Sequence, residues 1–117
     1  METKALSLEV FKALDDKKAH NIKVLDVQGV TSIADYFIIA TGTSTKHASS
    51  LAESVEESLS EMGLEPSHKE GYRTGEWILL DYLDVIVHVF TEETREFYKL
   101  EKMWKDAEIV QVSVDTY

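Results

Sequence analysis

The sequence contains no cysteine. This absence excludes disulfide bonds, thiol nucleophiles and zinc sites built from cysteine. Proline occurs once and glycine five times, which favours long regular elements joined by few turns. No apolar run approaches the roughly 20 residues that a membrane-spanning helix needs, and the charged N-terminal segment lacks the apolar core of a secretory signal. We therefore expect a cytoplasmic protein that does not enter a membrane.

Basic residues are scarce as well. The chain has 12 lysines and arginines against 22 aspartates and glutamates, so its formal net charge is −10. A negative field of this size repels the phosphates of RNA and DNA, so a basic protein is a better partner than a nucleic acid. The alternative is that the charge only keeps the chain in solution, and the charge taken alone favours that interpretation.

The order of apolar patterns predicts the fold class. The length of 117 residues is typical of one domain, so 1–117 is treated as a single unit. Helical spacing predicts helices over about Ser7–Lys18, from after Gly42 to Gly63, and onward from about Thr91–Thr94. The runs that predict strands are Ile22–Val27, Tyr36–Thr41, Trp77–Asp81, Asp84–Phe90 and, as an edge strand, Ile109–Val114. This order predicts an α/β domain with a mixed β-sheet flanked by helices.

The ends and faces of the helices carry further signals. Ser44 or Thr45 is suited to cap the second helix, and Gly63 is suited to close it. On the third helix, the side chains predicted to pack inward are Phe97, Leu100, Met103 and Trp104. For Arg95 and Tyr98, packing and contact with a partner are equally favoured, because both residue types are common in binding hot spots.

The segment ATGTSTKH (Ala40–His47) joins a strand, a glycine and a helix start. Such a junction can hold a phosphate through free backbone N–H groups. A P-loop, however, contains more glycine and ends in Gly-Lys-Ser/Thr, whereas Gly42 stands alone and Lys46 is not placed as that motif requires. A turn glycine followed by a helix cap is the preferred interpretation.

The stretch WILLDYLDVIVHVF (Trp77–Phe90) predicts a β-hairpin with two different faces. With a two-residue turn at Tyr82-Leu83, the expected cross-strand pairs are Asp81–Asp84, Leu79–Ile86 and Trp77–His88. The aliphatic face, which is expected to be core, holds Ile78, Leu80, Val85, Val87 and Val89. The mixed face, which resembles an interface core with a polar rim, holds Trp77, Leu79, Asp81, Asp84, Ile86, His88 and Phe90.

The acids and the histidine of this hairpin raise the question of a metal site or an acid–base pair. A metal ion needs three or four converging ligands. At the rise of a strand, His88 lies ~13 Å from the end of the ladder that carries Asp81 and Asp84. We therefore expect no metal, no cofactor and no catalytic residue, and we favour a hydrogen-bonded histidine beside Trp77.

Three blocks of the sequence resemble the ribosomal silencing factor family, also known as the Iojap-like family. They are ADYFIIATGTSTKH, GEWILLDYLDVIVHVF and REFYKLEKMW, in this order and at this spacing. The resemblance covers the chain from about the first helix through Trp104. The family's characteristic residues that carry over are Asp35, Tyr36, Gly42, Ser44, Gly71, Trp77, Asp81, Asp84, His88, Arg95, Tyr98, Leu100 and Trp104. One departure is Leu83, where the family usually has glycine; a tight primed turn needs positive φ, which leucine disfavours.

The resemblance implies a nucleotidyltransferase-like fold and a homodimer. It implies binding to the fourteenth protein of the large ribosomal subunit, which blocks joining of the small subunit and lowers translation when nutrients are short. The alternative is a nucleotidyltransferase-like nucleotide-binding enzyme, but such an enzyme needs two carboxylates one residue apart on a strand, and Ile86 stands two positions after Asp84. We therefore expect no enzymatic activity. The residues expected to contact the ribosomal protein or a second copy are Trp77, Leu79, Asp81, Asp84, His88, Phe90, Arg95 and Tyr98.

Overall fold

The computed structural model describes residues 2–99 and 108–110. In this part of the chain the helices are α1 (Thr3–Asp16), α2 (Thr45–Ser60) and α3 (Glu92–Tyr98). The strands are β1 (His20–Asp26), β2 (Tyr36–Gly42), β3 (His68–Glu70), β4 (Trp77–Asp81), β5 (Val85–Thr91) and β6 (Glu108–Val110). They form one sheet in the order β3-β4-β5-β2-β1-β6, in which β2 and β5 are parallel and the other neighbours antiparallel. The predicted α/β domain with a mixed sheet is confirmed.

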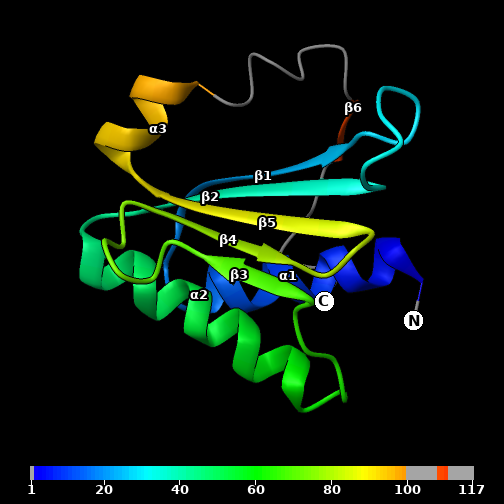
Figure 1. Cartoon of the computed structure of the whole chain (residues 1–117), viewed down its shortest axis with the longest axis horizontal. Helices are drawn as coiled ribbons and strands as arrows, with labels where there is room; N and C mark the ends of the chain where they lie inside the picture. The colour runs from blue at the N-terminus through cyan, green and yellow to red at the C-terminus, as the bar shows by residue number, and fades with distance from the viewer. Residues whose placement is uncertain (1, 100–107, 111–117) are drawn as a thin grey trace.

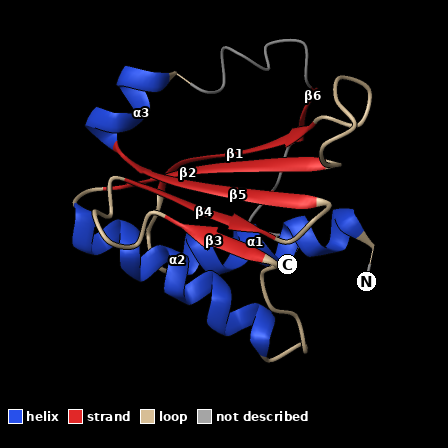
Figure 2. Ribbon diagram, in the orientation of Figure 1, coloured by secondary structure: helices blue, strands red, loops and turns tan. Residues whose placement is uncertain are grey.

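The helices lie on both sides of the sheet. Helices α1 and α2 pack against one face, and α3 lies on the opposite side (Figures 1 and 2). The main core fills the space between the sheet and the first two helices, and Val10, Leu14, Leu51 and Val55 are buried there. The predicted aliphatic face of the hairpin belongs to this core, and its members, each 0% exposed, are Ile78, Leu80, Val85, Val87 and Val89. That prediction is confirmed.

The ends of α2 follow the predicted capping residues. Ser44 is the N-cap, and its Oγ accepts a hydrogen bond from the His47 N–H at 3.0 Å. At the other end Gly63 has φ +79°. The N–H groups of Gly63 and Leu64 donate back to carbonyls of the last turn, which is the pattern of a Schellman motif. Both predicted caps are confirmed.

Some boundaries differ from the prediction. Helix α1 covers Thr3–Asp16 rather than about Ser7–Lys18. Strand β3 was not predicted, because its segment has no alternation of apolar and polar residues. All three of its residues are exposed. Helix α2 ends at Ser60, before Gly63, and Met62 beyond its end is 39% exposed.

Helix α3 begins where the sequence predicts. Thr91 is its N-cap, and the Thr91 Oγ1 accepts from the Thr94 N–H at 3.4 Å. The helix ends before Lys99, which has φ +48°. Its buried side chain is Arg95, and Phe97 is 79% exposed, so the prediction that Phe97 packs inward is wrong. The other members of that predicted stripe lie outside the described residues; they are Leu100, Met103 and Trp104.

The last strand supports the predicted C-terminal edge strand. Strand β6 pairs antiparallel with β1 and stands at the edge of the sheet. The remainder of the predicted strand, 111–114, lies outside the described residues.

The hairpin register differs from the predicted one. The observed cross-strand pairs are Trp77–Phe90, Leu79–His88 and Asp81–Ile86. The turn residues are Leu83 and Asp84, because the Tyr82 N–H donates to the Val85 carbonyl at 2.9 Å. The carboxylate of Asp81 accounts for the shift: its Oδ1 accepts from the Leu83 N–H at 2.7 Å, as in an Asx turn. Since the register moves by two residues, the side chains within β4 and β5 keep their predicted faces, whereas Asp84 lies in the turn and not on the mixed face of the strand.

Candidate interaction surface

A second apolar cluster lies on the face of the sheet that α1 and α2 do not cover (Figure 1). Its buried members are Leu25, Val27, Ala34, Phe37, Ile39, Ile86 and Phe90, with Trp77 and Leu79 partly buried against them. The predicted mixed face of the hairpin is therefore the outer part of this cluster. Phe90 is 0% exposed, so it supports the surface from beneath instead of forming it.

Trp77 and His88 form a polar pair within this cluster. The indole N–H of Trp77 donates to Nδ1 of His88 at 3.1 Å, which confirms the predicted histidine contact. His88 is 5% exposed, and burial lowers its pKa to about 4 from an ordinary value of 6.5. Because Nδ1 accepts, the neutral ring carries its proton on Nε2, and that atom has no hydrogen-bond partner among the described residues. His88 is a neutral, buried support for the indole.

The aspartates of the hairpin have separate roles. Asp81 uses its carboxylate to hold the Leu83 N–H. Asp84 is exposed, and its backbone carbonyl accepts from the N–H groups of Asp35 and Tyr36 at 2.8 and 3.1 Å. These bonds attach the hairpin turn to the start of β2. The acids therefore lie at the turn, and within the described residues no group of acids and histidines could hold a metal ion.

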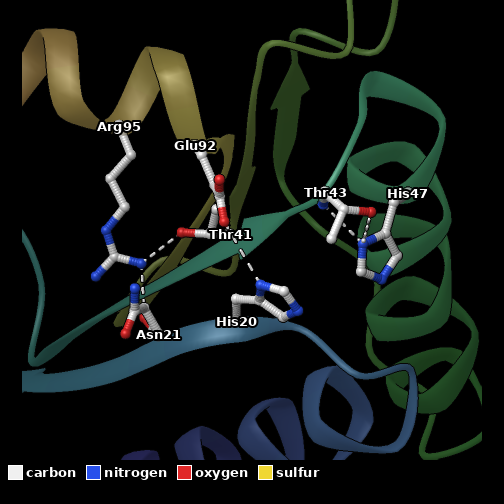
Figure 3. Close-up of polar contacts among 7 residues, drawn as sticks. All are labelled: His20, Asn21, Thr41, Thr43, His47, Glu92 and Arg95. Atoms are coloured by element: carbon white, nitrogen blue, oxygen red, sulfur yellow. Dashed lines mark hydrogen bonds and ion pairs between the residues drawn. The ribbon is translucent and has the colours of Figure 1, made fainter.

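Arg95 is a buried anchor for α3. Its side chain crosses from the helix to the sheet, as Figure 3 shows. The Nη1 group donates to the Asn21 carbonyl at 2.6 Å and to the Thr41 Oγ1 at 2.7 Å, and the residue is 7% exposed. Of the two readings that the sequence leaves open for Arg95, the geometry favours packing. Sequence reasoning missed Asn21 and Thr41, because neither lies near Arg95 along the chain.

Tyr98 presents an aromatic edge to solvent. Its ring lies 4.8 Å from the Trp77 ring and 5.0 Å from that of Phe97, centroid to centroid. Tyr98 is 51% exposed and Phe97 is 79% exposed. A chain of rings thus runs from the buried His88 through Trp77 to the surface. Phe97 was missed as a surface residue, since helical spacing alone favoured an inward position.

A groove of about 650 Å³ opens beside these rings. The loop Thr43–Thr45 and Glu76 line it, together with the first turn of α3, Phe97 and Tyr98. It lies where the parallel strands β2 and β5 end, and each strand leads there into a helix. Ligands commonly bind at such carboxyl ends of parallel strands.

The loop at this end of β2 is held by His47. Its Nδ1 accepts from the Thr43 N–H at 2.9 Å, and its Nε2 contacts the Lys17 carbonyl at 2.9 Å; Figure 3 shows the contact with Thr43. A Cβ on Gly42 would lie 2.7 Å from the Ala48 nitrogen, so glycine is needed for helix packing. These contacts support a turn glycine and a helix cap in place of a phosphate loop.

The described helices include none that is long and apolar enough to cross a membrane.

Comparison with known proteins gives one consistent family. The family described as "Ribosomal silencing factor during starvation" matches residues 1–116. The ribosomal silencing factor of Halalkalibacterium halodurans is 41% identical over 100 residues, which covers 86% of each chain. That of Bacillus subtilis is 37% identical over 112 residues, covering 96% of this chain and 95% of the relative.

The fold agrees with a solved relative. A crystal structure of a protein from Chromobacterium violaceum superposes with a TM-score of 0.88 at 36% identity, covering 97% of this chain and 94% of the other. Members of the matched family are silencing factors and not enzymes. The chain belongs to the ribosomal silencing factor family.

Proposed function

We propose that this chain binds the large ribosomal subunit through its fourteenth protein and so prevents the small subunit from joining. Proteins of this family bind the large subunit. The observation that carries the proposal is the exposed aromatic edge of Tyr98 and Phe97. Both belong to α3, which lies on the side of the sheet opposite to α1 and α2 (Figure 1). Exposed aromatic groups beside acids suit a basic protein surface.

The proposed contact residues divide into two groups. Tyr98, Asp84 and the accessible parts of Trp77, Leu79 and Asp81 contact the partner. The residues that support them from below are His88, Phe90 and Arg95. The second group acts by fixing the positions of the first.

The biological consequence is repression of translation when nutrients are limiting. A large subunit whose joining face is occupied cannot form a complete ribosome. The net charge of −10 keeps the chain from binding ribosomal RNA nonspecifically, so contact depends on the basic protein. The chain acts in this way in the cytoplasm.

We also propose that the free chain is a homodimer. Trp77, Phe97 and Tyr98 expose aromatic surface on one side of the molecule, and soluble monomers tend to avoid such patches. Light scattering across a range of concentrations tests this directly. A monomer mass at the highest concentration contradicts it.

Subunit joining tests the main proposal. Large subunits are incubated with the chain before small subunits are added, and the joined ribosome peak is measured on a sucrose gradient. The peak should fall with increasing wild-type protein and should fall much less with Tyr98→Ala. Met62→Ala removes an exposed apolar side chain at the end of α2 and serves as the matched control. An unchanged peak at saturating wild-type protein contradicts the proposal.

The identity of the partner needs a separate measurement. Tyr98 is replaced by the photo-crosslinking residue benzoylphenylalanine, the complex with large subunits is irradiated, and the crosslinked protein is identified by mass spectrometry. The fourteenth protein of the large subunit should be the main product. Crosslinking to a different ribosomal protein would contradict the proposed partner, and the proposed silencing of the large subunit would still stand.

A further inference from the structure

The groove beside α3 combines two kinds of side chain that attract a cation. Glu76 and Glu93 line it, and neither forms an ion pair with any other described residue. Phe97 and Tyr98 line the same groove and are 79% and 51% exposed. Carboxylates bind a guanidinium or ammonium group through charge-assisted hydrogen bonds, and an aromatic face adds attraction for the same group.

The nearby basic side chains do not neutralise this groove. Among the described residues, none that lines it is a lysine or an arginine. Arg95 is directed at Asn21 and Thr41 on the sheet. Lys99 lies 3.3 Å from Glu96. Within the described part of the chain, Glu76 and Glu93 therefore have no cationic partner and can meet a cation from another molecule.

The acids of α3 also have a role within the helix, which accounts for part of the pattern. Glu92 and Glu93 lie in the first turn of α3, where negative charge is favourable, and Glu92 also lies 3.6 Å from His20. Glu76 is not on a helix. Its carbonyl accepts from the Thr91 N–H at 3.1 Å, which places Glu76 beside the start of α3. Helix stabilisation explains neither Glu76 nor the exposed rings.

We propose that this groove receives a cationic side chain, arginine in preference to lysine, from the protein to which the chain docks. This inference rests on the proposed function and adds the chemical class of one contact and its place in the fold. Arginine is preferred because its planar guanidinium can stack on an aromatic ring while it donates to a carboxylate. The phosphates of RNA would be repelled by the same acids.

Matched charge-neutralising variants of the full chain test the groove. The double variant Glu76→Gln/Glu93→Gln removes the two acids of the groove that form no ion pair with another described residue, and it leaves Glu92, which lies beside His20. The control, Glu57→Gln/Glu61→Gln, makes the same charge change at exposed positions at the end of α2, on the other side of the sheet. Affinity for purified large subunits is measured by cosedimentation at constant salt. The groove variant should bind at least about tenfold more weakly than wild type, and the control within about threefold.

A third variant tests the aromatic wall without changing charge. Phe97→Ala should weaken binding by about tenfold, as expected for an exposed aromatic anchor. Thermal melting of every variant shows whether the chain is still folded. If the double variant melts early, Glu76→Gln alone, outside the helices, takes its place and should still bind more weakly than the control.

The outcomes separate the two proposals. Wild-type protein that does not cosediment with large subunits overturns the proposed function and this inference together. Wild type that binds, with a groove variant equal to the control, overturns the groove inference and leaves the proposed function standing. Tighter binding by the groove variant would mean that the groove faces phosphate, and would also overturn the inference.

Discussion

The indole N–H of Trp77 lies 3.1 Å from Nδ1 of His88, although the hairpin register pairs His88 with Leu79 and Trp77 with Phe90. The contact is thus diagonal across the β4–β5 ladder, within reach of long side chains. It requires Nδ1 to be unprotonated. The position of the indole at the surface therefore depends on a buried histidine that stays neutral.

This dependence predicts a stability that falls in mild acid. The pKa of His88 is lowered to about 4 from 6.5, so between these values the unfolded chain binds a proton that the folded chain does not. The stabilisation is full above pH 6.5 and is lost as the pH falls toward 4. The free energy of unfolding in urea should decrease by about 2 kcal/mol from this group between pH 7 and pH 5.

Because other histidines titrate in the same range, the comparison is made with His88→Phe. Between pH 7 and pH 5, the free energy of unfolding of the variant should decrease by about 2 kcal/mol less than that of wild type. Equal pH dependence in the two proteins would show that His88 takes up a proton in the folded state.

Leu83 predicts a substitution that stabilises the chain. Leu83 has φ +74° and is 65% exposed, so it has backbone strain and little burial to lose. Leu83→Gly should raise the free energy of unfolding by about 0.5–1 kcal/mol, since glycine has no Cβ to strain this conformation. Leu83→Ala keeps the strain and should change stability by less than about 0.5 kcal/mol. A glycine variant that is less stable than the alanine variant contradicts this prediction.

The aspartates of the hairpin should separate stability from binding. Asp81→Lys removes the acceptor of the Leu83 N–H and should cost about 1 kcal/mol. Asp84 is exposed, and Asp84→Lys should alter stability by less than about 0.5 kcal/mol. Both charge reversals should weaken binding to large subunits, because they place positive charge against a basic partner. Melting curves beside cosedimentation provide the test, and normal binding by Asp84→Lys would remove this acid from the interface.

Arg95 and Tyr98 distinguish an anchor from a contact. Arg95→Lys loses the Nη1 group that donates to both Asn21 and Thr41. It should cost about 1–3 kcal/mol in urea unfolding, with weaker binding as a result. Tyr98→Ala should cost less than about 1.5 kcal/mol, because its two aromatic pairs, with Trp77 and Phe97, involve a half-exposed ring and lie near the lower end of the range of about 0.5–1.5 kcal/mol for a pair. Binding should fall more strongly. A fully stable Arg95→Lys protein that no longer binds would show that Arg95 itself contacts the partner.

Local patterns were enough to predict most of the elements. The aliphatic runs of β4 and β5 and the cap at Ser44 depend on neighbours in the sequence, and each was predicted correctly. The hairpin register was not predicted correctly, because the turn depends on the hydrogen bond that the Leu83 N–H donates to the Asp81 carboxylate. A register shift of two residues leaves the strand side chains on the same faces, so the alternation of side chains in the sequence cannot predict it.

The candidate surface was harder to predict, because it depends on distant contacts. Arg95 anchors α3 because it donates hydrogen bonds to Thr41 and to the Asn21 carbonyl. Asn21 has φ +47°. Nothing near Arg95 in the sequence indicates either acceptor. The groove likewise joins the loop Thr43–Thr45 to Glu76 and α3, which meet only because β2 and β5 lie side by side.

The short strand β3 limits how this protein can associate. An edge strand with free backbone groups invites pairing with another chain, and proteins commonly blunt such edges by keeping them short and charged. Strand β3 has three residues, all exposed, and Lys69 and Glu70 are charged. This edge therefore discourages aggregation by sheet extension.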